Sequence, residues 1–201
     1  DHGWRIGVVG QSHSVIENLL DSVVDAGLDP ASVAKKAAST GPHPWVSVTS
    51  CAKYLAAHTG GCVVGATTWA FTNRKEFAEQ ELDLLVVDEA GQFSLADTIA
   101  VARVARNLLL LGDPQQLPQV SQGSHPEPVD TSALGWLADG SDTLPADLGY
   151  FLATTRRMHP ELCSVVSDLS YDGRLRSHDT VLGRHLDGVD PGVHTVLVDH
   201  E

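Results

Sequence analysis

LLVVDEAGQ, residues 84–92, runs from four aliphatic residues directly into two carboxylates, Asp88 and Glu89. A second run of the same design, LLLLGDPQQ, follows at residues 108–116. Short apolar runs bounded by turn residues are typical of strands that are buried on both faces of a parallel sheet. In open α/β sheets the ligand crevice lies outside the carboxyl ends of the strands, so both polar turns are predicted to line a site.

The composition is that of a globular chain with a strongly acidic balance. Its 201 residues are 42% hydrophobic, which is enough for one domain or for parts of two. The 26 Asp and Glu residues outnumber the 13 Lys and Arg residues and give a formal net charge of -13. This charge disfavours a protein whose whole surface binds phosphate groups, so any contact with nucleic acid is predicted to be confined to a small part of the surface.

Cysteine usage and hydropathy predict a protein of the reducing cytoplasm. The three cysteines are too few and too scattered for a disulfide framework, and none belongs to a Cys-x-x-Cys zinc motif. The longest apolar stretches are far shorter than the roughly 18 to 20 residues that span a bilayer, and no basic and apolar leader precedes them. The ten histidines show no paired helical spacing with carboxylates, which disfavours a histidine metal site.

Strand and helix patterns alternate along the first part of the chain. Strands are predicted at residues 6–9, 46–48, 62–66, 84–87 and 108–111, and helices at residues 14–26, 52–58, 74–80 and 94–106. Ser14 and Glu17 have the spacing of a capping box, whereas residues 29–44 have the Pro and Gly content of a connecting excursion. The alternation implies right-handed crossovers and a mainly parallel sheet.

The pattern changes after residue 120, which predicts two lobes. Residues 1–120 are predicted to form most of the first lobe, and residues 121–145, which contain several Gly, Pro and Ser residues, a linker. Residues 146–201 are predicted to open a second lobe. Its predicted elements are a strand at 150–153, a helix at 161–169 and a strand at 195–199.

Consecutive carboxylates at a strand end suit phosphoryl transfer. Mg²⁺ prefers oxygen ligands, and an attacking water needs a group that orients it and accepts its proton. We therefore assign Asp88 to Mg²⁺ and Glu89 to the water. An Asp-Glu pair in a solvated turn is the alternative for an isolated dipeptide, but the aliphatic run before this pair and the second run downstream favour a site.

The turn after the next strand adds an amide and a third carboxylate. Gln116 lies where a neutral amide can sense a terminal phosphate or help to hold the water. The alternative is that Gln115 and Gln116 only satisfy the loop backbone. Asp113 either caps the turn or contacts the metal shell, and the sequence leaves both roles open.

Two adjacent arginines follow the first predicted strand of the second lobe. In RRMHP, residues 156–160, a guanidinium of Arg156 or Arg157 can reach across a cleft between lobes to a triphosphate. Salt bridges at the surface are the alternative. The position of the arginines after both acidic turns favours the first interpretation.

Two further polar turns follow predicted strands and are candidates for contact with nucleic acid, because their side chains can donate hydrogen bonds to backbone phosphates. They are Ser12 with His13 and Thr67 with Thr68. Trp69 and Phe71 come directly after the second of these turns. Such aromatic residues either stack on bases or pack the core, and packing is the favoured interpretation.

No phosphate-binding loop of the form Gly-x-x-x-x-Gly-Lys-Ser/Thr occurs in the chain. The chain by itself is therefore predicted to bind nucleoside triphosphate poorly and to be inactive. It begins with Asp1 rather than Met, and residues 4–9 already have the pattern of a strand. We therefore expect a longer polypeptide that supplies the loop and its helix ahead of Asp1.

Taken in order, these segments resemble the motifs of superfamily 1 helicases, specifically the 1B group that includes the nonsense-mediated-decay helicase and its bacterial relatives. VVGQSH at 8–13 resembles motif Ia, VVGATT at 63–68 motif Ic, DEAGQ at 88–92 motif II, GDPQQLP at 112–118 motif III and RMHPEL at 157–162 motif IV. The resemblance implies a RecA-like P-loop NTPase sheet with helices on both faces, an incomplete first lobe and the start of a second. It also implies ATP and Mg²⁺ as cofactors and single-stranded DNA or RNA as the partner.

The same resemblance suggests roles for single residues. Gln116 stands in the phosphate-sensing place, Arg157 is the arginine that approaches the γ-phosphate, and motifs Ia and Ic contact the strand. Arg156 stands where family members commonly carry a tyrosine that stacks on adenine, which implies a cation–π contact instead. Gln11 and His13 replace the usual Pro and Asn of motif Ia, so strand gripping differs in detail. The chain is also similar to actinobacterial helicases that are joined to a RecB-like nuclease, although no nuclease residues are visible in it.

Two rival classes fit the same pattern less well. One is a non-catalytic α/β binding or regulatory module that has lost its triphosphate site. The other is a nucleotide hydrolase that ignores nucleic acid. A phosphate loop upstream would separate the motor from the module, and stimulation of ATPase activity by single-stranded DNA or RNA would separate the motor from the hydrolase.

Overall fold

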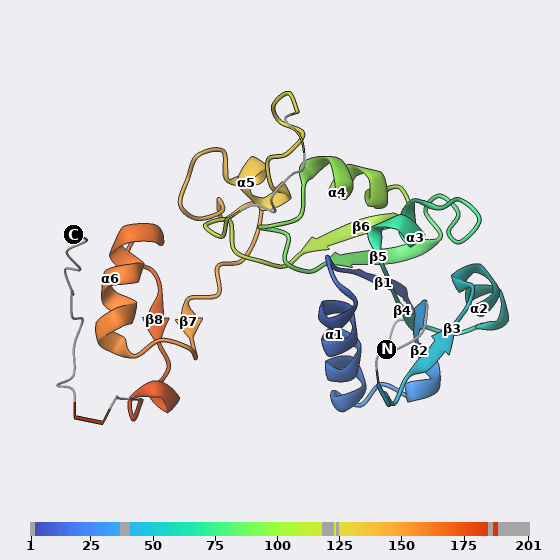
Figure 1. Ribbon diagram of the computed structural model, residues 1–201, viewed down its shortest axis with the longest axis horizontal. Coiled ribbons are helices and arrows are strands. Elements are labelled where there is room, and N and C mark those ends of the chain that lie inside the picture. The colour runs from blue at the N-terminus through green and yellow to red at the C-terminus, as the bar shows by residue number, and fades with distance from the viewer. Residues whose placement is uncertain (1–2, 37–40, 118–122, 124, 185–186, 189–201) are drawn as a thin grey trace, which may run out of the picture. The chain divides into compact units, whose positions relative to one another are not determined.

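The structure is a computed structural model that describes residues 3–36, 41–117, 123, 125–184 and 187–188. The chain divides into two compact units, Asp1–Leu137 and Ala138–Glu201. The first unit contains a six-stranded parallel sheet, and the second contains a two-stranded parallel sheet (Figure 1).

Within the described residues, the first unit is built on a six-stranded sheet in which every pairing is parallel. Its strands are β1 (Arg5–Val9), β2 (Val33–Lys36), β3 (Val46–Val48), β4 (Cys62–Ala66), β5 (Leu82–Val87) and β6 (Ala105–Leu110). They lie in the order β3-β2-β4-β1-β5-β6, so the carboxyl ends of all strands meet at one edge of the sheet. The predicted α/β class, with a mainly parallel sheet, is confirmed.

Helices connect these strands and cover both faces of the sheet. They are α1 (His13–Asp25), α2 (Cys51–Ala57), α3 (Thr68–Thr72) and α4 (Leu95–Ala102), with a short 3-10 helix at Pro30–Ser32. Figure 1 shows α1 and α4 on opposite sides of the sheet. On the α1 side, Ile16 and Leu20 are fully buried against Val8, Val33 and Val63, which fixes α1 to the central strands.

Ser12, rather than Ser14, caps α1. The Ser12 Oγ accepts the Val15 N–H at 3.2 Å. Glu17, which was expected to complete a capping box, is buried, and its Oε1 lies 3.0 Å from the Nζ of Lys35 on β2. The capping-box prediction is wrong because a buried ammonium group attracts the carboxylate more strongly than one backbone N–H does.

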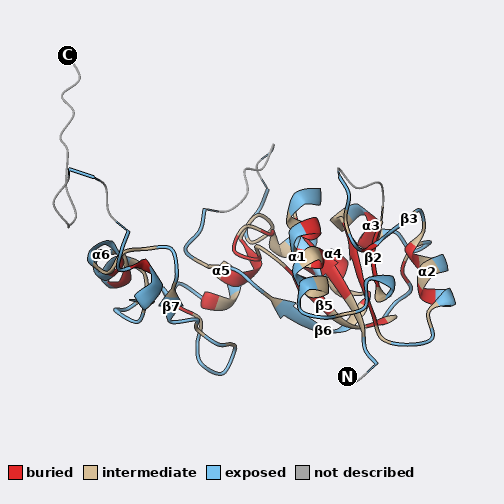
Figure 2. Cartoon of the chain, turned by 90° about the horizontal axis from the view of Figure 1, so that it is seen from below, coloured by how far each residue is buried: buried red, intermediate tan, exposed pale blue. Residues whose placement is uncertain are grey.

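β6 is an exposed edge strand, although its apolar run predicts burial on both faces. It pairs with β5 on one side and, among the described residues, with no strand on the other. Leu108 is 42% exposed and Leu109 is 43% exposed, and most of the strand is pale blue in Figure 2. Leu85 and Val87 of β5, which pairs on both sides, are fully buried. The burial prediction is therefore correct for β5 and wrong for β6, because burial depends on neighbours as well as on the run itself.

The short helix predicted at residues 74–80 does not form, and α3 forms ahead of it. The Oδ1 of Asn73 accepts the Lys75 N–H at 3.0 Å and closes a turn. Phe77 is then buried, and its ring stacks on that of Phe71 with 4.5 Å between the centroids. Core packing of an aromatic residue thus overrides the helical pattern. Residues 29–44, predicted to be a connecting excursion, also contain β2. Its two lysines gave it no apolar pattern from which a strand could be predicted.

Glu76 joins three segments of the first unit. Its Oε1 lies 2.6 Å from the Nζ of Lys36 at the end of β2, and its Oε2 accepts the Cys51 N–H at 2.8 Å at the start of α2. Burial by itself raises the pKa of Glu76, but these hydrogen bonds outweigh it and hold the pKa below its ordinary value of 4.5.

We expect Glu76→Gln to lower the free energy of unfolding by about 1–2 kcal/mol at neutral pH, because an amide cannot replace a carboxylate that pairs with an ammonium group. Folding lowers the pKa of Glu76, so its carboxylate stabilises the fold above the ordinary value of 4.5. That stabilisation is lost as the pH falls through the folded-state pKa. Urea unfolding at neutral and acid pH measures the difference between variant and wild type, which should shrink on acidification.

Glu79→Gln is the matched control, because the Glu79 side chain is 67% exposed and its ion pair with Arg74 is equally open to solvent. This variant should unfold like the wild type at every pH. A Glu76→Gln difference that stays constant with pH would contradict the assigned role of the carboxylate.

Residues 121–145, predicted to be a linker, contain the helix α5 (Ala133–Ala138). The Ala133 N–H donates to the carbonyl of Phe93 at 2.9 Å, so the start of α5 is bonded to the segment that precedes α4. The first unit accordingly continues to Leu137.

The described part of the second unit consists of short elements. These are β7 (Thr154–Thr155), α6 (Pro160–Ser170), β8 (Arg176–Ser177) and a 3-10 helix at Asp179–Val181, and β7 pairs with β8 in parallel. The helix predicted at 161–169 is confirmed. The strand predicted at 150–153 is wrong, since regular pairing begins only at Thr154, and the strand predicted at 195–199 lies outside the described residues.

The three cysteines, Cys51, Cys62 and Cys163, are buried free thiols, which confirms that they form no disulfide framework. Among the described helices, none has the length and apolar character that crossing a membrane requires.

Candidate functional site

Asp88 and Glu89 leave the carboxyl end of β5 in a fixed conformation. The Asp88 N–H donates to the carbonyl of Val9 at 3.0 Å, which extends the pairing of β5 with β1 by one residue. The Asp88 Oδ1 accepts the Glu89 N–H at 3.0 Å. Glu89 has φ +56°, a left-handed conformation that is uncommon for a residue with a side chain and that is often found at functional sites.

The turns after β5 and β6 are packed directly against each other. The Ala90 N–H donates to the carbonyl of Leu111 at 2.7 Å. A Cβ atom on Gly91 would collide with the carbonyl of Asp113, and one on Gly112 would lie 2.8 Å from the Ala90 nitrogen. Only glycine therefore allows this approach at either position, and Gly112 also has φ +154°.

A side-chain hydrogen bond links the same two turns. The Gln92 Nε2 donates to the Gln116 Oε1 at 2.7 Å. The structure thus brings Gln116 to the turn that carries Asp88 and Glu89. The sequence pattern did not reveal that Gln92 positions Gln116, nor that the two turns approach closely at their glycines. The signal for both was the Gly in each acidic turn, Gly91 and Gly112.

Asp113 caps its own turn. Its Oδ1 accepts the Gln115 N–H at 3.0 Å, and the carbonyl of Asp113 accepts the Gln116 N–H at 3.2 Å. The sequence left two roles open for Asp113, capping the turn and contacting the metal shell. The hydrogen bond from the Gln115 N–H supports the first of them. The backbone of Gln116 is held by this turn, while its side chain extends to Gln92.

A cavity of about 310 Å³ lies beside the two carboxylates. Asp88 and Glu89 form one wall, and the other wall comes from α1, through Val15, Asn18 and Leu19, with Ser22 completing the lining. A half-exposed carboxylate beside a cavity is accessible to a cation and to water.

The donor set at this position fits Mg²⁺ held in part by a nucleotide. Mg²⁺ usually takes one or two protein carboxylates and completes its shell with water and substrate phosphate oxygens. Asp88 offers a carboxylate of fixed orientation at the cavity wall. In the part of the chain that the structure describes, no three His, Cys, Asp or Glu residues gather into a metal cage.

The candidate residues for nucleic-acid contact lie at the same edge of the sheet. β1 and β4 pair in parallel with Val9 opposite Ala66, so the turns that follow them are neighbours. His13 is exposed, and the hydroxyl of Ser12 is engaged in capping α1. These turns contain the four predicted residues, Ser12, His13, Thr67 and Thr68.

The two aromatic residues after Thr68 differ in their surroundings. Phe71 is fully buried and stacks on Phe77, as packing of the core predicts. Trp69 is 87% exposed, so for this residue the packing interpretation is wrong.

In the second unit, Arg156 and Arg157 occupy the turn between β7 and α6. The Arg157 N–H donates to the Thr155 Oγ1 at 3.1 Å, and its carbonyl accepts from the Arg184 Nη1 at 2.8 Å. The Arg156 Nη1 lies 3.4 Å from the Nδ1 of His178. Both side chains are exposed, and among the described residues neither forms an ion pair with a carboxylate, which weakens the surface salt-bridge alternative.

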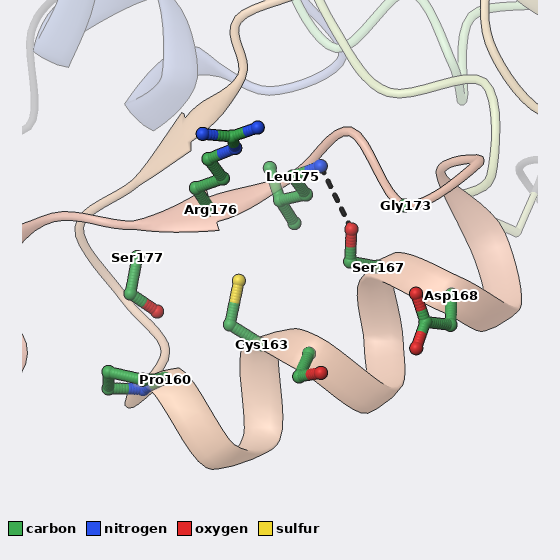
Figure 3. A pocket seen from close by; sticks show the side chains of 9 residues that line it. Pro160, Cys163, Ser167, Asp168, Gly173, Leu175, Arg176 and Ser177 are labelled. Atoms are coloured by element: carbon green, nitrogen blue, oxygen red, sulfur yellow. Dashed lines mark hydrogen bonds between the residues drawn. The ribbon is translucent and has the colours of Figure 1, made fainter.

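A pocket of about 210 Å³ lies between α6 and β8 (Figure 3). Ser167 holds the two elements together, since its Oγ accepts the Leu175 N–H at 2.9 Å. Cys163, on the same face of α6, is 2% exposed. Neither Arg156 nor Arg157 lines this pocket. The buried thiol and the hydrogen bond inside it indicate a place where α6 and β8 pack together.

Residues 61–122 match a family model described as an AAA domain. This segment begins just before β4 and includes both acidic turns with the hydrogen bond between Gln92 and Gln116. Among solved structures, Arterivirus nonstructural protein 10, a helicase in complex with DNA, is similar with a TM-score of 0.38 and 17% sequence identity. The match covers 61% of this chain and 26% of the viral protein, so this chain spans about a quarter of that helicase.

Proposed function

We propose that this chain forms part of the ATP-hydrolysing core of a cytoplasmic helicase or translocase, which couples ATP hydrolysis to movement along single-stranded DNA or RNA. The observation that carries the proposal is the contact between the two polar turns, where Gln92 bonds Gln116 beside Asp88 and Glu89. A carboxylate pair and an amide on adjacent parallel strands are suited to hold Mg²⁺, water and a terminal phosphate together. The AAA-domain match over residues 61–122 supports the nucleotide part of the proposal.

Each candidate site residue on the turns after β5 and β6 has a role in this mechanism. Asp88 would hold Mg²⁺, which neutralises charge on the phosphate oxygens when it is bound. Glu89 orients the attacking water and accepts its proton at the carboxylate. Gln116 contacts the γ-phosphate, and Gln92 and the turn capped by Asp113 hold Gln116 in position.

The proposal assigns the arginines of the second unit to the same nucleotide in the longer polypeptide. Arg157 stabilises the charge that develops during hydrolysis, and Arg156 stacks on the nucleotide base by a cation–π contact. In this scheme residues 1–120 form most of the first lobe, residues 121–145 lead out of it by way of α5, which packs within the first unit, and residues 146–201 open the second lobe. Ser12, His13, Thr67 and Thr68 contact the backbone of the nucleic acid.

The phosphate-binding loop belongs, in this proposal, to a longer polypeptide that contains this chain. We propose that the strand leading into the loop pairs in parallel with β6 and covers its exposed leucines. β6 adjoins β5, so a loop at the carboxyl end of such a strand emerges beside Asp113 and Gln116. A fused nuclease domain is a further part of the proposal for the longer polypeptide.

ATPase assays on the longer polypeptide and on this chain alone test the proposal. We expect the longer polypeptide to hydrolyse ATP, single-stranded DNA or RNA to stimulate it, and this chain alone to be inactive. Hydrolysis that nucleic acid does not stimulate would support the rival nucleotide hydrolase. Absence of ATP binding by the longer polypeptide would support the rival non-catalytic module.

A further inference from the structure

We infer that Trp69 is a stacking platform for a nucleobase, so that this chain holds single-stranded nucleic acid by a base as well as by its phosphates. The inference rests on the proposed function, because it assumes that the strand passes over the carboxyl edge of the sheet. The turns at the ends of β1 and β4 are predicted to contact the phosphate backbone of the nucleic acid. Trp69 would add a contact with a base.

The first observation is the exposure of Trp69. Its side chain is 87% exposed, although Trp is among the residues with most to gain from burial. Trp69 stands one residue after Thr68, at the carboxyl end of β4 and therefore beside the turn that carries Ser12 and His13. An aromatic face at this place is within reach of a strand whose phosphates contact these turns.

The second observation is that α3 is rigidly held beneath Trp69. Phe71, on the opposite side of α3, is fully buried and stacked on Phe77. The Arg103 Nη2 donates to the carbonyls of Phe71 and Thr72 at 3.2 and 3.0 Å, and the Thr72 Oγ1 donates to the carbonyl of Trp69 at 3.1 Å. A fixed helix loses little entropy when its exposed ring stacks, which favours binding.

The third observation is the local charge. Although the chain has a net charge of -13, residues 30–75 contain no Asp or Glu. Lys35 and Lys36 of this segment pair with Glu17 and Glu76. Its other basic residues, Lys53, Arg74 and Lys75, are exposed. Arg74 and Lys75 directly precede Glu76, which is bonded to the end of β2 and to the start of α2, so these two cations lie near the same sheet edge. These exposed cations, in a segment without carboxylates, complement a polyanion and favour a nucleic-acid strand as the occupant.

Binding of short single-stranded oligomers to the chain tests the inference. The probes are labelled oligothymidylate and an abasic oligomer of the same length, so that both carry the same phosphates and only one carries bases. Fluorescence anisotropy gives the affinity, and quenching of Trp emission reports stacking. Trp69→Ala should weaken binding of oligothymidylate roughly 5- to 100-fold, the range expected for one base on one aromatic ring, and leave binding of the abasic oligomer unchanged.

Two further variants define the effect. Trp69→Phe keeps an aromatic face and should retain most of the affinity. Trp136→Ala removes a Trp of α5 that is 53% exposed and should leave both affinities unchanged. Trp69 is exposed, so its replacement leaves the core intact, and urea unfolding of each variant verifies this.

Equal binding of oligothymidylate by wild type and Trp69→Ala would overturn the inference while leaving the proposed function in place, since strand-stimulated ATPase activity of the longer polypeptide is measured separately. Failure of the wild type to bind either oligomer would also overturn it. If ATPase activity were in addition indifferent to nucleic acid, the proposed function would fail as well.

Discussion

Replacing Glu89 by Gln in the longer polypeptide should reduce ATP turnover by about 10²- to 10⁴-fold, the range expected when a general base is removed. Nucleotide binding should stay within a few-fold of wild type, because the amide has the shape of the carboxylate and Asp88 is untouched. Glu89 already has φ +56°, and Gln meets the same backbone requirement as Glu, so the turn should keep its form. Steady-state ATPase assays and binding of a labelled nucleotide measure the two quantities.

The exposed Glu79 provides the control for this experiment, since Glu79→Gln makes the same chemical change away from the site. It should leave turnover unchanged. Retention of strand-stimulated ATPase activity by Glu89→Gln would refute the role of Glu89 as the base. Loss of nucleotide binding would instead give Glu89 a part in holding Mg²⁺.

The largest loss of stability is expected from Lys35→Met. The side chains of Lys35 and Glu17 are 0% and 5% exposed, and their ion pair joins β2 to α1. Removing Lys35 leaves the buried Glu17 carboxylate without its ammonium partner, with the His43 Nε2 at 3.6 Å from its Oε2, and costs about 3–5 kcal/mol. Urea unfolding of the chain, followed by circular dichroism, measures this loss.

Two comparisons show whether the cost comes from the unpaired charge. Lys36→Met changes the neighbouring lysine, whose side chain is 24% exposed, and should cost about 1 kcal/mol. The double variant Lys35→Met with Glu17→Leu removes both charges and should recover most of the lost stability. If Lys35→Met were no less stable than Lys36→Met, the ion pair would not be the reason that both residues are buried.

The positions of Asp88, Glu89 and Gln116 could be predicted from the sequence because each depends on a local pattern, an apolar strand followed by a turn. The contact that brings the two turns together could not, since it depends on the close approach of Gly91 and the Asp113 backbone in three dimensions. The hydrogen bond between Gln92 and Gln116 follows from that approach. Local signals therefore located the ends of the strands but not the residues that position them.

Competition between local and distant partners explains the incorrect predictions. Glu17 has the spacing of a capping residue, but Lys35 lies on a strand that the sequence pattern did not reveal, and the buried ion pair prevails. Trp69 follows an apolar strand as a core residue would, yet α3 directs Phe71 inward and leaves Trp69 in solvent. Which of two aromatic residues enters the core depends on the space beside Phe77, which no local pattern encodes.

The outer edge of β6, which no strand of the described residues occupies, has a consequence for handling this chain in solution. Such an edge offers N–H and C=O groups to any strand that approaches, and natural proteins guard it with charges, prolines or bulges. In β6 the charged residue Arg106 stands near the start, whereas residues 108–110 are consecutive leucines. Molecules of the isolated chain can therefore join edge to edge and aggregate, whereas a polypeptide that occupies this edge with its own strand removes the hazard.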